Sequence, residues 1–213
     1  MHEPVNFTQL PGRVRWFAGI AAAVLLLSVG VAVGVLVPIL RAPSDESVDA
    51  GYARDMSLHH GQAVEMSMIA FRRADSAVVR TVGYDMAATQ QWQIGAMQTW
   101  LVQWDLLPTG TRPPMAWMPG GSRALLPDGR MPGMASPEDL TSLKQATGKD
   151  FDILWCQLML RHHLGGIHMS EIAAVQAAEG HVRETAGKIL RSQQSDIELL
   201  RDILTKLGGK PLS

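Results

Sequence analysis

The sequence predicts an all-α protein in which one N-terminal transmembrane helix precedes a four-helix bundle made of two repeated helical hairpins. Three observations support this fold class. Residues 17–40 are an uncharged apolar run, a unit of about sixty residues recurs within 48–211, and apolar residues in each copy recur at helical spacing. A chain of 213 residues has room for one such domain beside an appendage.

The apolar run at residues 17–40 is expected to be a membrane anchor. At about 1.5 Å per residue it can cross a hydrocarbon core of about 30 Å. Two arginines precede it and acidic residues dominate after it, so residues 1–16 are placed in the cytoplasm and the bundle on the extracytoplasmic (periplasmic) side, beyond a linker at 41–47. The alternative is a cleaved signal peptide, but its apolar region is usually shorter, about 7–15 residues, and ends in small residues.

Residues 48–108 and 151–211 are interpreted as two copies of one unit, joined by a crossover at 109–150. The segment MSLHHGQAVEMSMIA at 56–70 aligns with MLRHHLGGIHMSEIA at 159–173, with Met, His-His, Met-Ser and Ile-Ala in matching places. Similarity at a fixed offset indicates structural duplication. Each copy shows two helical patterns, whose apolar stripes a four-helix bundle would bury against each other.

The helix ends of the second copy follow from glycine. We expect one helix from about 150 to 178, ended by Gly180, and another from about 181 to 207. The crossover is rich in Pro and Gly, so it is predicted to be irregular apart from a short helix that begins after Ser136.

The residues with distinctive chemistry lie on the first helix of each copy. At about 100° per residue they share one broad face, whereas Glu65 and His168 point away from it. These residues are Met56, His59, His60 and Met66 in the first copy, and Met159, His162, His163 and Met169 in the second. Asp55, one turn before His59, is expected to orient that ring, which its counterpart Leu158 cannot do.

This face has two interpretations. A lone buried His is usually a hydrogen-bonded core residue, and a stripe of Met usually fills gaps in packing. The duplication, however, brings four His and four Met to facing helices, and four buried imidazoles need a metal ion or a dense hydrogen-bond network. Imidazole and thioether together fit copper as Cu(I), whereas zinc would gain little from Met.

A carboxylate-bridged iron centre does not fit this pattern. Such bundles use Glu-x-x-His, but this chain has Met56 and Met159 where the Glu would stand. The second helices offer glutamines in place of carboxylates, namely Gln90, Gln91, Gln193 and Gln194. An oxidase is therefore disfavoured, and the protein is not expected to be an enzyme.

A second methionine group lies in the crossover. Met115 and Met118 form one Met-x-x-Met pair, and Met131 and Met134 form another. In a flexible segment such pairs could capture Cu(I) without a preformed pocket. The alternative is that they pack over the end of the bundle as an apolar lid.

The two Met-x-x-His-His segments with the intervening Met131-Pro-Gly-Met134 resemble the bacterial family called "domain of unknown function 305" over residues 48–207. The resemblance implies a ferritin-like four-helix bundle that is secreted or membrane-anchored, with copper-binding members. Carried over by position, it implicates the eight His and Met residues of the repeats together with Met131 and Met134. Gly165 and Gly166 depart from the family pattern.

The first functional hypothesis is a membrane-anchored extracytoplasmic protein that binds Cu(I) for buffering, tolerance or delivery to a copper transporter or acceptor. The alternative is a non-catalytic interaction or assembly subunit of a membrane protein complex, in which the His and Met are structural. With a formal net charge of −1, nothing favours nucleic acid as a partner. The single Cys excludes a CxxC site, and Cys156 is expected to be a core residue.

Overall fold

The computed structural model describes residues 11–212 and is all-helical, which confirms the predicted fold class. Seven helices and no strand occur in this part of the chain. They are α1 (Gly12–Arg41), α2 (Val48–Arg73), α3 (Ala77–Gln103), α4 (Gly121–Ala124), α5 (Pro137–Gln145), α6 (Gly148–Gln176) and α7 (Gly180–Lys206). The predicted cytoplasmic segment 1–16 lies mostly outside the described residues. Two compact units meet between Ala42 and Pro43.

The first unit contains α1, which is long and apolar enough to cross a membrane. Its mean hydropathy reaches 2.8 within Gly12–Val37, and none of that segment is buried. A helix that is apolar on every side requires surroundings other than water or a covering partner. Length and composition therefore fit a membrane anchor or a signal sequence.

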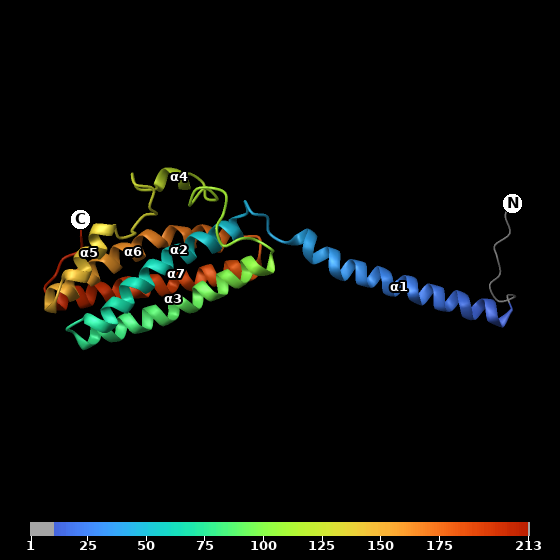
Figure 1. Cartoon of the computed structure of the whole chain (residues 1–213), viewed down its shortest axis with the longest axis horizontal. Coiled ribbons are helices and arrows are strands. Elements are labelled where there is room, and N and C mark those ends of the chain that lie inside the picture. The colour runs from blue at the N-terminus through green and yellow to red at the C-terminus, as the bar shows by residue number, and fades with distance from the viewer. Residues whose placement is uncertain (1–10, 213) are drawn as a thin grey trace. The chain divides into compact units, whose positions relative to one another are not determined.

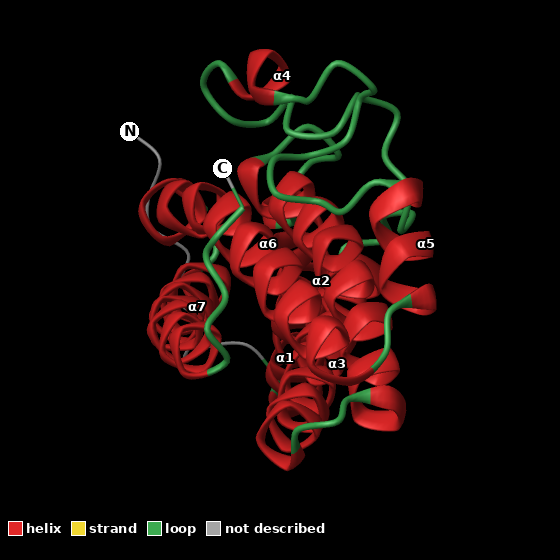
Figure 2. Ribbon diagram, turned by 90° about the vertical axis from the view of Figure 1, so that its left-hand side faces the viewer, coloured by secondary structure: helices red, strands yellow, loops and turns green. Residues whose placement is uncertain are grey.

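The second unit is a bundle of four long helices (Figures 1 and 2). Helix α2 packs on α3 and α6 packs on α7, so each pair forms a hairpin, and α2 contacts α6 between the hairpins. Ser47 caps α2 by accepting the N–H of Ala50 at 3.1 Å, and Ser76 caps α3 by accepting the N–H of Val79. These side chains satisfy N–H groups that have no partner inside the first helical turn.

A buried carboxylate in each hairpin accepts two backbone N–H groups from the turn that precedes the second helix of the other hairpin. Asp49 at the start of α2 accepts the N–H groups of residues 178 and 179, both at 2.9 Å. Asp152 in α6 accepts the N–H groups of residues 75 and 76 at 3.1 and 2.8 Å. The two sets of contacts are 103 positions apart in the sequence, which is the offset between the matching segments.

The boundary between α6 and α7 differs from the prediction. Helix α6 ends at Gln176, and Gly180 is the first residue of α7 instead of a stop signal. Just before α7, Asp49 accepts the N–H group of Glu179, a contact 130 residues away along the chain that no local pattern reveals. At the other end of α7, Gly208 has a φ of 71°, which favours glycine.

Two apolar clusters fill the bundle, one on each side of the paired histidines. The methionine-rich cluster contains Tyr52, Met56, Met97, Met115, Met118, Met131 and Met169 among its members. The second, which we call the α5-side cluster, contains Met66, Leu143, Phe151, Trp155, Cys156 and Met159. Along both α2 and α6 the histidines lie between residues of the two clusters, so they form a polar layer inside an apolar core.

The crossover is largely irregular, as its Pro and Gly content predicts, but it also contains α4, a single helical turn that we did not predict. The expected short helix is α5. Ser136 and Asp139 form a reciprocal capping box at its start, with Pro137 in the first turn.

Candidate metal centre

Four histidines form the polar layer where α2 meets α6. His59, His60, His162 and His163 are at most 1% exposed. The rings of His59 and His162 stack across the two helices with centroids 3.8 Å apart, and those of His162 and His163 are 6.1 Å apart. Gly166 permits this approach, because a Cβ there would lie 3.0 Å from Cε1 of His59.

Backbone carbonyls orient three of the four rings. Nε2 of His59 donates to the carbonyl of Pro132 at 3.2 Å, and Nε2 of His162 donates to the carbonyl of His59 at 3.0 Å. Nδ1 of His163 donates to the carbonyl of Met159 at 2.9 Å. Metal-binding histidines are commonly fixed this way, since the donated proton leaves the lone pair of the other ring nitrogen free.

The environment keeps three of these rings neutral, namely those of His59, His60 and His162. Burial, together with the neighbouring imidazoles, lowers the pKa of His59 to about 4 and that of His60 to about 3. Burial also lowers the pKa of His162 well below its ordinary value, again with the other three rings contributing. A neutral imidazole has a lone pair to offer, so these rings need not lose a proton before binding a metal ion at neutral pH.

The predicted methionine ligands lie on both sides of the histidine layer. Met56 and Met169 belong to the methionine-rich cluster, and Met66 and Met159 belong to the α5-side cluster. All four are completely buried, and the sulfur of Met56 lies 4.0 Å from the amide nitrogen of Gln193. The structure thus places two thioethers beside each end of the layer.

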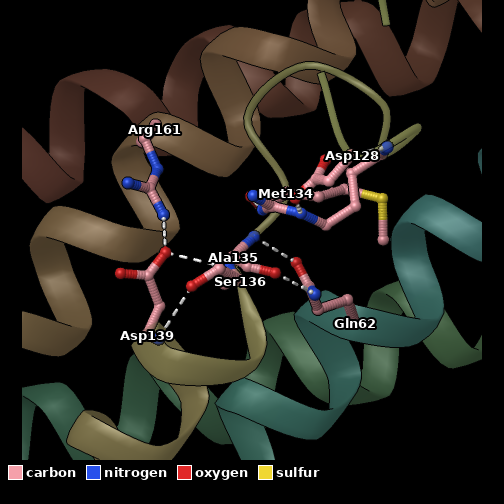
Figure 3. A network of polar contacts seen from close by, with 8 residues as sticks. Gln62, Asp128, Met134, Ala135, Ser136, Asp139 and Arg161 are labelled. Carbon is pink, nitrogen blue, oxygen red and sulfur yellow. Dashed lines mark hydrogen bonds and ion pairs between the residues drawn. The ribbon is translucent and has the colours of Figure 1, made fainter. Parts of the chain in front are cut away.

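The crossover contacts this layer directly. Gln62 of α2 exchanges two hydrogen bonds with the backbone of Ala135, at 2.9 and 2.6 Å (Figure 3). Gly165 of α6 lies against the loop so closely that a Cβ would be 2.1 Å from the carbonyl oxygen of Pro132. That carbonyl accepts the hydrogen bond from His59. Because Gly165 has no side chain, the crossover can lie close to α6 and still orient a ring that α2 contributes.

The crossover methionines pack as a lid. Met115, Met118 and Met131 are buried in the methionine-rich cluster, and Met134 packs against it. This arrangement matches the second of the two alternatives, in which these side chains cover the end of the bundle. Met131 consequently shares a cluster with Met56 and Met169, two of the predicted ligands from the helices.

The role expected for Asp55 is wrong. Its carboxylate accepts the backbone N–H of Met115 at 2.6 Å and the indole N–H of Trp117 at 2.7 Å, so it anchors the crossover. Nδ1 of His59 has no hydrogen-bond partner, so Asp55 does not orient that ring.

Other expectations concern residues outside the layer. Glu65 and His168 are exposed, so neither faces the histidines. Cys156 is buried in the α5-side cluster, and burial raises the pKa of its thiol to about 12, which keeps it protonated and unreactive.

Sequence reasoning named Gln90 and Gln193 among the polar residues of α3 and α7, but it missed Gln93 and Asp196. Gln90 donates to Nε2 of His163 at 3.5 Å, and a carboxylate oxygen of Asp196 lies 3.4 Å from the same nitrogen. Gln93 and Gln193 are also buried, whereas Gln91 and Gln194 are exposed. The available signal was the spacing of Gln193 and Asp196, which puts them on one helix face, three residues apart.

The donor chemistry of the layer fits a soft metal ion. Among the described residues no three His, Cys, Asp or Glu side chains form a group that could hold an ion, so the four histidines do not make a ligand set by themselves. Both ring nitrogens of His60 and Nδ1 of His59 are buried without partners. Buried acceptors of this kind are rare unless a ligand or water satisfies them.

The model of the family described as "Domain of unknown function (DUF305)" matches residues 49–204. No curated protein matches the chain.

Solved structures with the same fold include two DUF305 proteins and CopM. A DUF305 protein from Streptomyces coelicolor described as secreted is 40% identical, with a TM-score of 0.73 over 80% of this chain and 99% of that one. A DUF305 fragment from Deinococcus radiodurans is 24% identical, with a TM-score of 0.62 over 78% and 98%. CopM in its Cu(I)-bound form is 20% identical, with a TM-score of 0.58 over 78% and 99%, and it has also been solved with Cu(II) and Ag.

Proposed function

The chain belongs to the DUF305 family, and from that premise we propose that it is a membrane-anchored extracytoplasmic protein that binds Cu(I) through buried His and Met side chains. The observation that supports this most is the histidine layer itself. Three imidazoles are oriented by backbone carbonyls, and buried thioethers flank the layer on both sides. Neutral nitrogen and sulfur donors select soft ions.

The ligands come from three parts of the chain. Helices α2 and α6 supply the imidazoles and thioethers, and the crossover adds Met131 and Met134. The set is Met56, His59, His60, Met66, Met159, His162, His163, Met169, Met131 and Met134. The similarity of fold to CopM, which binds Cu(I), Cu(II) and Ag, supports copper as the ion.

The proposed role is to buffer copper or hand it on, without catalysis. Residues 17–40 within α1 would hold the bundle at the outer face of a membrane, near a copper transporter or acceptor. The description of one relative as secreted supports an extracytoplasmic location.

The test is Cu(I) retention by the full-length purified chain against a chelator of moderate affinity. Replacing His59, His60, His162 and His163 by Ala is expected to abolish retention, whereas replacing the exposed His168 and His181 by Ala is the matched control and should leave it unchanged.

Because four buried substitutions can unfold the bundle, a second variant keeps the packing. Met56→Leu with Met169→Leu conserves side-chain volume and removes two thioethers, so it should fold and yet release Cu(I) more readily. Unchanged retention in both the His and the Met variants would refute the proposed ligands.

A further inference from the structure

A groove between α3 and α7 leads from the surface toward the histidine layer. It encloses about 190 Å³, and its lining includes Asp85, Gln90, Gln93, Gln193 and Asp196. The acidic residues alone would not define a site. The groove matters because one of its lining residues, Gln90, contacts His163.

Beside Asp196, which lines this groove, lies a ring nitrogen of His163. Nδ1 of His163 donates its proton to the carbonyl of Met159, so in the neutral ring Nε2 has only a lone pair. Nε2 lies 3.4 Å from a carboxylate oxygen of Asp196. Two acceptors at that distance repel each other unless a positive charge, either a proton or a metal ion, lies between them.

Two buried amide oxygens point to the same kind of occupant. Oε1 of Gln90 and Oε1 of Gln193 have no hydrogen-bond partner, although the two residues are only 5% and 4% exposed. Both side chains line the groove. A cation, or the water molecules that it holds, would satisfy these oxygens, and the amide of Gln90 can turn its oxygen toward Nε2 of His163 with no change of shape.

The equivalent position in the first hairpin lacks the carboxylate. The residue 103 positions before Asp196 is Gln93, so the groove presents an amide beside His60 where it presents a carboxylate beside His163. Imidazole nitrogen with carboxylate and amide oxygen suits a borderline divalent ion better than Cu(I).

We infer that His163, Asp196 and Gln90 form a nitrogen–oxygen site for a divalent cation of the Zn(II) or Cu(II) class, present only in the second hairpin. The inference rests on the proposed function, because it gives the same metal-handling bundle a second kind of site that shares His163. Asp196 would hold the ion at the open side of the layer, and the thioethers would play no part.

The test titrates the full-length chain in detergent with Zn(II) alone, which has no redox chemistry, and measures affinity and stoichiometry by calorimetry. The wild-type chain should bind one Zn(II) at this site, and Asp196→Asn should weaken that binding about tenfold or more. Glu198→Gln is the matched control, because it removes the same charge from an exposed position on α7. The exposed pairs His168–Glu171 and His181–Glu179 are unaltered in every variant, so their contribution cancels.

Gln93→Asp is the converse variant. It places a carboxylate beside His60 and should add a second Zn(II) equivalent. A wild-type chain that binds no Zn(II), equal Zn(II) affinity in the wild-type and Asp196→Asn proteins, or no extra Zn(II) in Gln93→Asp would each overturn the inference.

Cu(I) retention of the same samples separates this inference from the proposed function. Asp196→Asn should retain Cu(I) as the wild type does, because thioether and imidazole donors remain in place. Loss of Zn(II) binding together with retained Cu(I) supports the separate site, whereas parallel loss of both ions in the folded variant would show that Asp196 belongs to one common site and would overturn it.

Discussion

The two hairpins have the same Met-x-x-His-His pattern but different surroundings for its second imidazole. His60 in α2 has no hydrogen-bond partner on either ring nitrogen. His163 in α6 donates to Met159, accepts from Gln90 and faces Asp196. Duplication therefore preserved the candidate ligands and changed their environment. Two sites of equal affinity are not expected from such a pair.

The crossover adds to this difference. It contacts α2 through the side chain of Gln62, and it contacts α6 where Gly165, the residue 103 positions later, leaves room for its backbone. The first hairpin contacts the crossover through hydrogen bonds, and the second contacts it through close packing. The crossover therefore interacts with the two hairpins in different ways.

Among the changes that probe the two hairpins, acidification should have the largest effect on the free energy of unfolding. In the metal-free protein, burial holds the pKa of His59, His60 and His162 below the ordinary 6.5. The unfolded chain therefore binds protons first, so this stabilisation is complete above about pH 6.5 and is lost as the pH falls toward the folded-state values. Three such groups together lower the free energy of unfolding by about 4 kcal/mol for each unit by which the pH falls in this range.

The measurement is the free energy of unfolding by denaturant between pH 7 and pH 4.5, without metal. His60→Gln should reduce the slope by about 1.4 kcal/mol per pH unit, because one proton is no longer taken up on unfolding. An unchanged slope in that variant would show that His60 is not held neutral.

The matching contacts of Asp49 and Asp152 should contribute equally to the free energy of unfolding. Asp49→Ala and Asp152→Ala each leave two backbone N–H groups without their acceptor, which should lower the free energy of unfolding by about 2–4 kcal/mol. Chemical denaturation of the two variants should give similar losses. A loss in only one of them would show that the matching contacts do not have matching energies.

The loop contact should give the smallest effect and exists in one hairpin only. Gly165→Ala forces a methyl group against the carbonyl of Pro132, so we expect a loss of about 1–3 kcal/mol. Gly61→Ala on α2 is the matched control, because nothing lies within 4 Å of its added methyl group and it should stabilise the helix by up to about 1 kcal/mol. Equal thermal shifts in the two variants would contradict the close packing of the loop.

Much of this architecture follows from local sequence patterns. The apolar spacing and the fixed offset predict the helices of the bundle, and Ser136 with Asp139 predicts the start of α5. The four histidines and their flanking methionines are buried as the helical wheel predicts. These features depend on neighbours within one or two helical turns, which the sequence displays directly.

The missed features depend on contacts between distant segments. Asp49 binds the backbone just before α7, Asp55 binds the crossover instead of His59, and Asp196 reaches His163 from another helix. No periodicity within one helix reveals which residue of another helix will face it. The function of Gly165 is also visible only once the loop is placed against it.

The most direct test of the central claim is the copper content of the full-length protein after reconstitution with Cu(I) and removal of loosely bound ions. We predict at least one copper ion per chain and a thermal unfolding midpoint that rises with Cu(I), since binding to the folded state alone at 100 times Kd adds about 2.7 kcal/mol. A protein that retains no copper, and whose midpoint does not change with Cu(I), would contradict the account.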